Sequence, residues 1–153
     1  MTRPAALVLL ACLAAPPALG QPASPAPMSF DPADHQWVHR VLYVFAPTDA
    51  HPHFLAQRQT ATGFDEGFRE RDLLFVAVLE EGESLVDGQH AIDAASVRAL
   101  RERYEVAPGT FAVVLVGKDG AAKRRSAEPV PPSALFGQID QMPMRQREMR
   151  ERR

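Results

Sequence analysis

The chain has 153 residues, of which 46% are hydrophobic and 24% charged, and its formal net charge at pH 7 is −2. This composition is that of a globular protein. With 17 basic and 19 acidic residues it has no positive excess, which argues against nucleic acid as a partner. The single cysteine, Cys12, cannot form a disulfide within the chain.

Residues 1–20 have the pattern of a cleavable signal peptide. Arg3 makes the start of the segment basic, and an apolar run follows from Ala5 to Ala15. Ala18 and Gly20 place small residues at the −3 and −1 positions of a cleavage site before Gln21. We therefore expect cleavage after Gly20 and a periplasmic or secreted protein. The 133 residues that remain of the 153 suffice for one domain.

Two other interpretations of this segment are less favoured. A membrane span needs about 20 apolar residues, and the prolines after Ala15 end the run too early. The sequence Leu9-Leu10-Ala11-Cys12 loosely resembles a lipidation site, but little apolar sequence precedes Cys12. Cleavage after Gly20 would remove the only cysteine, so the mature core would hold without disulfides.

The mature chain divides into three parts. Residues 21–33 are predicted to be a flexible spacer rich in proline and alanine, residues 34–142 a folded domain, and residues 143–153 a basic helical tail. The tail is favoured as a solvated helix in which Glu148 and Glu151 pair with nearby arginines. Contact with an acidic partner or with anionic lipid headgroups is the alternative.

Three continuous apolar runs are predicted to be strands, at residues 41–46, 73–79 and 111–116. None of them alternates apolar with polar residues, and such runs indicate strands that are covered on both faces. A fourth strand is expected at residues 122–126, after a turn at Gly120. Its basic residues fit the edge of a sheet.

Helices are predicted between these strands. The first begins near Pro52 and is divided by Gly63, with an apolar face formed by Phe54, Ala61, Phe64 and Phe68. Asp93 is expected to cap the second helix, and a third lies near residues 133–141. The fold class is therefore α/β: a mixed sheet of four or five strands with helices on both faces.

This order is that of the thioredoxin fold, and local sequences narrow the resemblance. They are Trp37 and Arg40 before the first strand, FAVVLVGKDG at residues 111–120, and Leu135-Phe136 followed by Met142-Pro143-Met144-Arg145. The chain from Trp37 to Met149 resembles the thioredoxin-like family named domain of unknown function 4174. That family occurs in bacterial secreted proteins and as modules of animal extracellular-matrix and sushi-repeat proteins. The resemblance implies a fold and a compartment, without an established activity.

Redox-active thioredoxins carry Cys-x-x-Cys where the first strand meets the first helix, whereas this chain has Thr48, Asp49 and His51 there. Thiol–disulfide exchange needs a thiolate, so a mature chain without cysteine cannot perform it. The three side chains lie at a helix N-terminus, where polar ligands bind, and they are the candidate ligand-binding residues. Capping of the helix by Thr48 or Asp49 is the simpler interpretation. Thioredoxins also place a cis-proline before the third strand; at Pro108 we expect a trans bond.

Histidines invite a metal hypothesis. His35 and His39 are four residues apart, so that a helix would present both on one face, with Asp31 or Asp34 as a possible third ligand. Solvated histidines near a flexible terminus are the favoured interpretation, and we expect no metal and no cofactor. The leading hypothesis is an exported, non-redox thioredoxin-like module that binds a protein or a small ligand. A cysteine-independent enzyme or a metal-binding protein that uses Asp49 and His51 is the alternative.

Overall fold

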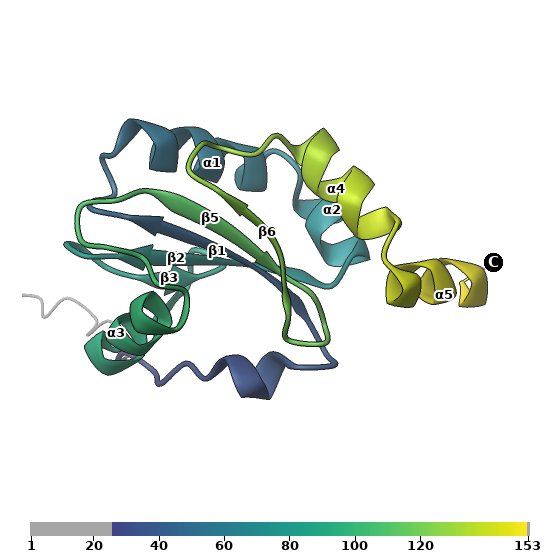
Figure 1. Cartoon of the computed structure of the whole chain (residues 1–153), viewed down its shortest axis with the longest axis horizontal. Helices are drawn as coiled ribbons and strands as arrows, with labels where there is room; N and C mark the ends of the chain where they lie inside the picture. Colours follow the sequence, from purple (N-terminus) through teal and green to yellow (C-terminus); the bar gives the residue numbers. More distant parts are fainter. Residues whose placement is uncertain (1–25, 153) are drawn as a thin grey trace, which may run out of the picture.

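The computed structural model describes residues 26–152, so the predicted signal peptide lies outside the described residues (Figure 1). The elements in chain order are the 3₁₀ helix η1 (Pro32–His35), β1 (Arg40–Ala46), α1 (Pro52–Thr62), α2 (Asp65–Glu70), β2 (Leu73–Leu79), β3 (Leu85–Val86), β4 (His90–Ala91), α3 (Ala94–Arg103), β5 (Ala112–Val116), β6 (Ala122–Ser126), α4 (Pro132–Asp140) and α5 (Pro143–Glu151). The predicted strands and helices are all present, and Gly63 separates α1 from α2 as expected.

The sheet has the strand order β4-β3-β2-β1-β5-β6. β1 is parallel to β2, and the other neighbouring pairs are antiparallel. The mixed α/β architecture is confirmed, with six strands in place of the four or five expected. The two additional strands, β3 and β4, have two residues each. Strands this short contain no apolar run from which they could be predicted.

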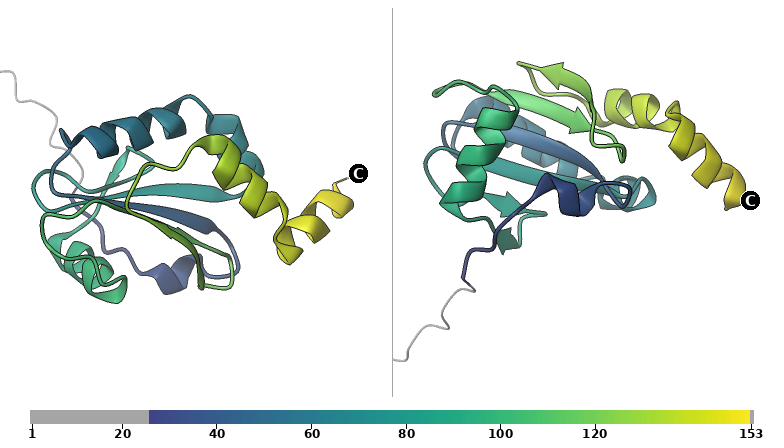
Figure 2. Two further views of the ribbon diagram at one scale, coloured as in Figure 1. Left: turned by 45° about the horizontal axis from the view of Figure 1, so that its top comes forward. Right: turned by 60° about the horizontal axis from the view of Figure 1, so that its bottom comes forward.

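Helices lie on both faces of the sheet (Figures 1 and 2), and alternate side chains of β1 pack against the two layers. Leu42 and Val44 face α1, α2 and α4, while Val41, Tyr43 and Phe45 face α3 and the N-terminal segment. Burial on both sides explains why the strand sequence is continuously apolar.

The folded domain begins earlier than the predicted boundary at residue 34. The Met28 amide donates to the Ala91 carbonyl at 2.8 Å, and the Met28 carbonyl accepts from Asp93 at 2.9 Å. Phe30 is 4% exposed, and its backbone amide donates to the buried Ser96 hydroxyl at 2.9 Å. A single aromatic residue within a proline-rich segment shows no periodicity, so the sequence did not indicate this docking.

Of the residues given a role in the predicted helices, Asp93 has the expected role and Phe64 does not. Asp93 caps α3 as predicted, because its Oδ1 accepts from the Ser96 amide at 2.7 Å. Phe64, expected on the apolar face of the first helix, precedes α2 and is 50% exposed. The interruption at Gly63 rotates Phe64 away from the face that Phe54 and Phe68 bury.

α5 is attached to the end of the sheet by buried charges, and is therefore not the solvated helix that the sequence favoured. Arg40, only 1% exposed, donates from Nη2 and Nη1 to the two carboxylate oxygens of Glu148 at 3.1 and 3.3 Å. Lys118 Nζ lies 2.9 Å from Glu148 Oε1 and 2.7 Å from Asp72 Oδ2. The partners of Glu148 thus come mainly from the sheet and its turn, with Arg145 at 3.7 Å as a neighbour on the helix.

A second set of contacts joins α5 to α2 and α4. Arg145 is 5% exposed; its Nη1 donates to the Glu70 carbonyl at 2.6 Å and its Nε to Asp140 at 3.2 Å. Arg71 Nη2 donates to the same Asp140 carboxylate at 2.6 Å. Arg71 and Asp72 are adjacent in the chain but bind different partners. Successive residues point in different directions, which places Asp72 beside Lys118.

Candidate functional site

The junction between β1 and α1 holds the three candidate residues, and it is organised by aromatic packing. His51 is the residue before the first turn of α1, and it has no side-chain capping bond. Neither Thr48 nor Asp49 caps the helix, so the capping interpretation was wrong. The Thr48 carbonyl accepts from the His51 amide at 3.3 Å, which closes a short turn.

The imidazole of His51 lies flat against Phe111, with ring centroids 5.7 Å apart and an interplanar angle of 4°. His53 meets the same phenylalanine edge-on at 5.2 Å, and its Nε2 is 3.4 Å from a carboxylate oxygen of Glu128. His51 Nδ1 is buried without a hydrogen-bond partner among the described residues. No local pattern predicted that Phe111 and Glu128 meet His51 and His53 here, because they come from distant segments of the chain.

The loop before β5 lies beside this junction, because Phe111 at its end packs on His51. Pro108 has a trans peptide bond, because residues 26–152 contain no cis bond. Glu80, at the end of β2, fixes the loop: it accepts from the Gly109 amide at 2.7 Å and pairs with Arg101 of α3. Gly109 has φ of +74°, a conformation that favours glycine.

Asp49 belongs to a different feature, a cleft of about 640 Å³ between α1, α2 and the β2–β3 hairpin. Thr48 and His51 are not among its lining residues, so the structure does not bring the three candidates together. The floor of the cleft is apolar and comprises Phe54, Phe68, Leu73, Phe75, Ala77, Leu79 and Leu85. Its rim is charged and comprises Asp49, Arg58, Asp65, Arg69, Glu83 and Asp87.

The histidines of the metal hypothesis do not lie on one helix. His35 ends η1 and His39 precedes β1, with Trp37 between them at φ of +68°. Their Nδ1 atoms are 3.4 Å apart, and His35 stacks on Phe30. Within residues 26–152 no three histidine, cysteine or acidic side chains are grouped so that they could hold a metal ion. Both imidazoles are half-buried against the domain. The favoured interpretation had instead expected them to be solvated.

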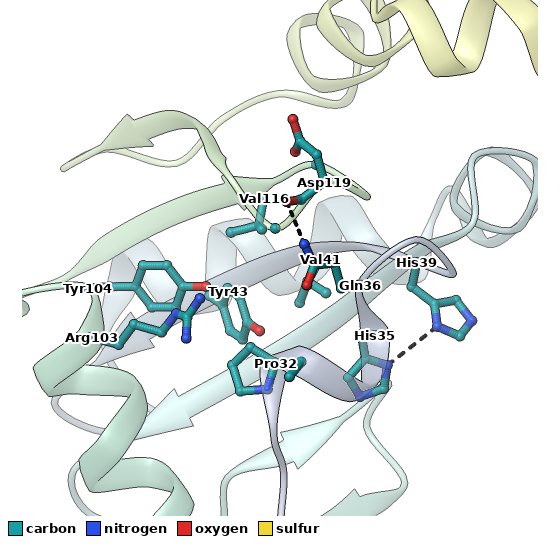
Figure 3. Close-up of a pocket in the computed structure, with 13 residues that line it drawn as sticks. Pro32, His35, Gln36, His39, Val41, Tyr43, Arg103, Tyr104, Val116 and Asp119 are labelled. Carbon is teal, nitrogen blue, oxygen red and sulfur yellow. Dashed lines mark hydrogen bonds between the residues drawn. The ribbon is translucent and has the colours of Figure 1, made fainter.

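His35 and His39 line a smaller cavity of about 180 Å³ on the α3 side of the sheet (Figure 3). Tyr43 of β1 and Tyr104 of α3's C-terminal end also line it, with Arg103 beside them. Tyr43 lies within the apolar run that predicted a strand at residues 41–46, and Tyr104 follows the helix that Asp93 caps. Their phenolic hydroxyls were the available signal, because buried tyrosine normally needs a hydrogen-bond partner.

Comparison with solved structures supports the fold. A reduced 2-Cys peroxiredoxin of Plasmodium vivax matches with a TM-score of 0.54 and 14% identity, over 79% of this chain and 84% of that chain. A thioredoxin peroxidase I of Plasmodium yoelii matches with a TM-score of 0.47 and 16% identity, over 78% and 76% of the two chains. At 14% identity the first match shows a shared thioredoxin-like fold and nothing about activity.

Among residues 26–152 there is no helix of the length and apolar character that crossing a membrane requires. The model of one family, described as Domain of unknown function (DUF4174), matches residues 31–148. That match begins before the predicted boundary at residue 34, in agreement with the docked N-terminal segment. The chain belongs to this family.

Proposed function

We propose that this protein is an exported, non-redox thioredoxin-like module that binds a small apolar molecule in the cleft between α1, α2 and the β2–β3 hairpin. The observation that carries the proposal is the cleft itself. Its volume of about 640 Å³ lies within the range of small-molecule sites. An apolar floor with a few polar groups at the rim is the usual composition of such sites.

The floor is formed by residues that the fold already holds rigid. Phe75 and Ala77 belong to β2, and Phe54 and Phe68 belong to the two helices above it. Asp87 reinforces the hairpin, because its Oδ1 accepts from the Phe75 amide at 2.8 Å. Arg58 lies 5.8 Å from the centroid of the Phe54 ring and can reach a polar group on a bound molecule. A site of this kind needs little rearrangement to bind.

The non-redox part of the proposal depends on Cys12, since residues 26–152 contain no cysteine. If export removes residues 1–20, no thiolate remains for disulfide exchange or peroxide reduction. We expect the exported protein to begin at Gln21 by mass spectrometry and to be inactive in dithiothreitol-dependent insulin reduction. An intact Met1, a lipid on Cys12, or insulin reduction at the rate of a thioredoxin would contradict this part.

Binding in the cleft is tested with aminoanthracene, a neutral apolar fluorophore. The mature protein should enhance its fluorescence saturably, and Ala61→Trp, which places a large ring in the cleft from α1, should abolish the enhancement. Ala56→Trp is the matched control, because Ala56 is exposed on the same helix and does not line the cleft. Equal binding by both variants would place the fluorophore elsewhere and would contradict the proposal.

A cysteine-independent enzyme or a metal-binding protein at the junction remains the second candidate. One observation favours it: the unpartnered Nδ1 of His51 lies beside His53, with the ring centroids 5.4 Å apart. Zinc or copper at near-stoichiometric content in protein purified without a His tag, lost in His51→Ala, would favour this candidate. A metal content unchanged in His51→Ala would exclude the junction as its source.

A further inference from the structure

The cavity on the α3 side of the sheet contains two buried hydroxyl groups without partners. Tyr43 is fully buried and Tyr104 is 9% exposed, and their ring centroids are 4.9 Å apart. Neither phenolic oxygen has a partner at good hydrogen-bond geometry among residues 26–152, although the Tyr104 hydroxyl is close enough to raise the pKa of Tyr43. Figure 3 shows Arg103 beside the Tyr104 ring, with Pro32 and His35 on the side of Tyr43. Burying an unpaired hydroxyl is unfavourable, so two of them at one cavity indicate a missing polar group.

The lining of this cavity offers an arginine to an anion, against the negative charge of Asp31 near Tyr43 and His35. Arg103 lines it and makes no ion pair within the described part of the chain. The carboxylate that also lines it, Asp119, already accepts from Lys123 at 2.5 Å and from the Ala121 amide at 3.1 Å. Burial raises the pKa of Tyr43, so its hydroxyl stays protonated and can donate. Burial and the neighbouring His39 lower the pKa of His35, which favours its neutral form.

The size of the cavity limits the ligand. An engineered cavity of roughly 150 Å³ holds benzene, so about 180 Å³ accommodates a molecule of similar size. We propose that this cavity binds a small monocarboxylate. Its carboxylate accepts hydrogen bonds from the Tyr43 and Tyr104 hydroxyls and pairs with Arg103, and its short apolar end lies against Val41 and Val116. Charge-assisted hydrogen bonds of this kind are stronger than neutral ones.

The proposal is tested on the mature chain with propionate as the probe and propionamide as its uncharged analogue of similar shape. At constant ionic strength, held with sodium chloride, propionate should raise the melting temperature progressively, because a ligand that binds only the folded state stabilises it. Propionamide should not. Saturation-transfer NMR should show contact between the propionate methyl group and the protein.

Three variants locate the binding site. Tyr43→Phe keeps the ring and removes one unpaired hydroxyl, so the free protein should be at least as stable as the parent while its response to propionate is lost. Arg103→Gln should also lose the response, and Arg98→Gln, an exposed arginine on α3 away from the cavity, should retain it.

If Tyr43→Phe does not fold, Tyr104→Phe provides the same test. Any one of three results would overturn the proposal: no stabilisation by propionate, equal stabilisation by propionamide, or an unchanged response in both tyrosine variants. The cavity would then bind water only. Aminoanthracene binding in the cleft is unaffected by any of these outcomes, so the two sites are tested separately.

Discussion

Replacing Glu148 by alanine is expected to lower the free energy of unfolding by about 3–5 kcal/mol, the usual effect of removing one partner from a buried ion pair. The reason is Arg40, whose side chain is 1% exposed and would keep its charge in the interior without a carboxylate. Its remaining contact would be the Arg71 carbonyl at 2.7 Å. Chemical denaturation with urea, followed by circular dichroism, measures the change.

Two further variants separate charge burial from other effects of the substitution. Glu151→Ala removes an exposed carboxylate from the same helix and should change the stability little. Arg40→Met combined with Glu148→Leu removes both charges and should recover most of the loss, because the isolated buried charge is the main cost. A Glu148→Ala variant as stable as Glu151→Ala would show that α5 does not depend on this pair.

The same ion pair should be visible in the response to acid. Burial by itself raises the pKa of Glu148, but hydrogen bonds and charges from Arg40 and Lys118 outweigh it and hold the pKa below its usual value. A carboxyl whose pKa is lower in the folded state stabilises the fold above its unfolded pKa of about 4.3, and this contribution is lost as the pH falls below it. Between about pH 6 and pH 3 Glu148→Ala should therefore lose less stability than the parent.

Gln57→Leu is expected to cost about 2–4 kcal/mol of stability, even though it replaces a buried polar side chain by an apolar one. Gln57 is fully buried on α1 and binds the backbone of Val130 twice: its Oε1 accepts from the Val130 amide at 2.7 Å, and its Nε2 donates to the Val130 carbonyl at 3.1 Å. Leucine would leave both backbone groups buried and unpaired, and each such group costs about 1–3 kcal/mol.

The matched control is Gln59→Leu, which changes an exposed residue of the same helix in the same way. It should alter the unfolding free energy by less than about 0.5 kcal/mol. Gln57→Glu provides a second comparison, because it keeps an acceptor for the Val130 amide and loses the donor to the carbonyl. Equal stability of Gln57→Leu and Gln59→Leu would mean that the segment before α4 does not need this connection to α1.

Most secondary structure followed from local pattern. The continuous apolar runs predicted β1, β2 and β5 because a strand covered on both faces needs apolar residues at every position. Gly63 and Asp93 marked helix boundaries through backbone geometry and capping, which depend on a few neighbouring residues. The thioredoxin-like order followed from these elements, while the two-residue strands β3 and β4 were too short to be recognised.

The candidate site was predicted only in part, because it depends on contacts between distant segments. Residues near the start of α1 were identified, but the fold separates Asp49, at the cleft, from His51, against Phe111. Arg40 and Glu148 are 108 residues apart in the chain, so no local pattern could pair them. Tyr43 and Tyr104 line the same cavity only because the packing of α3 on the sheet brings their rings together. The sequence by itself determined the helices and strands, because each depends on residues that are close together in the chain. Only the tertiary structure decided which charged groups and hydroxyls lie together, because folding brings distant segments together and removes them from water.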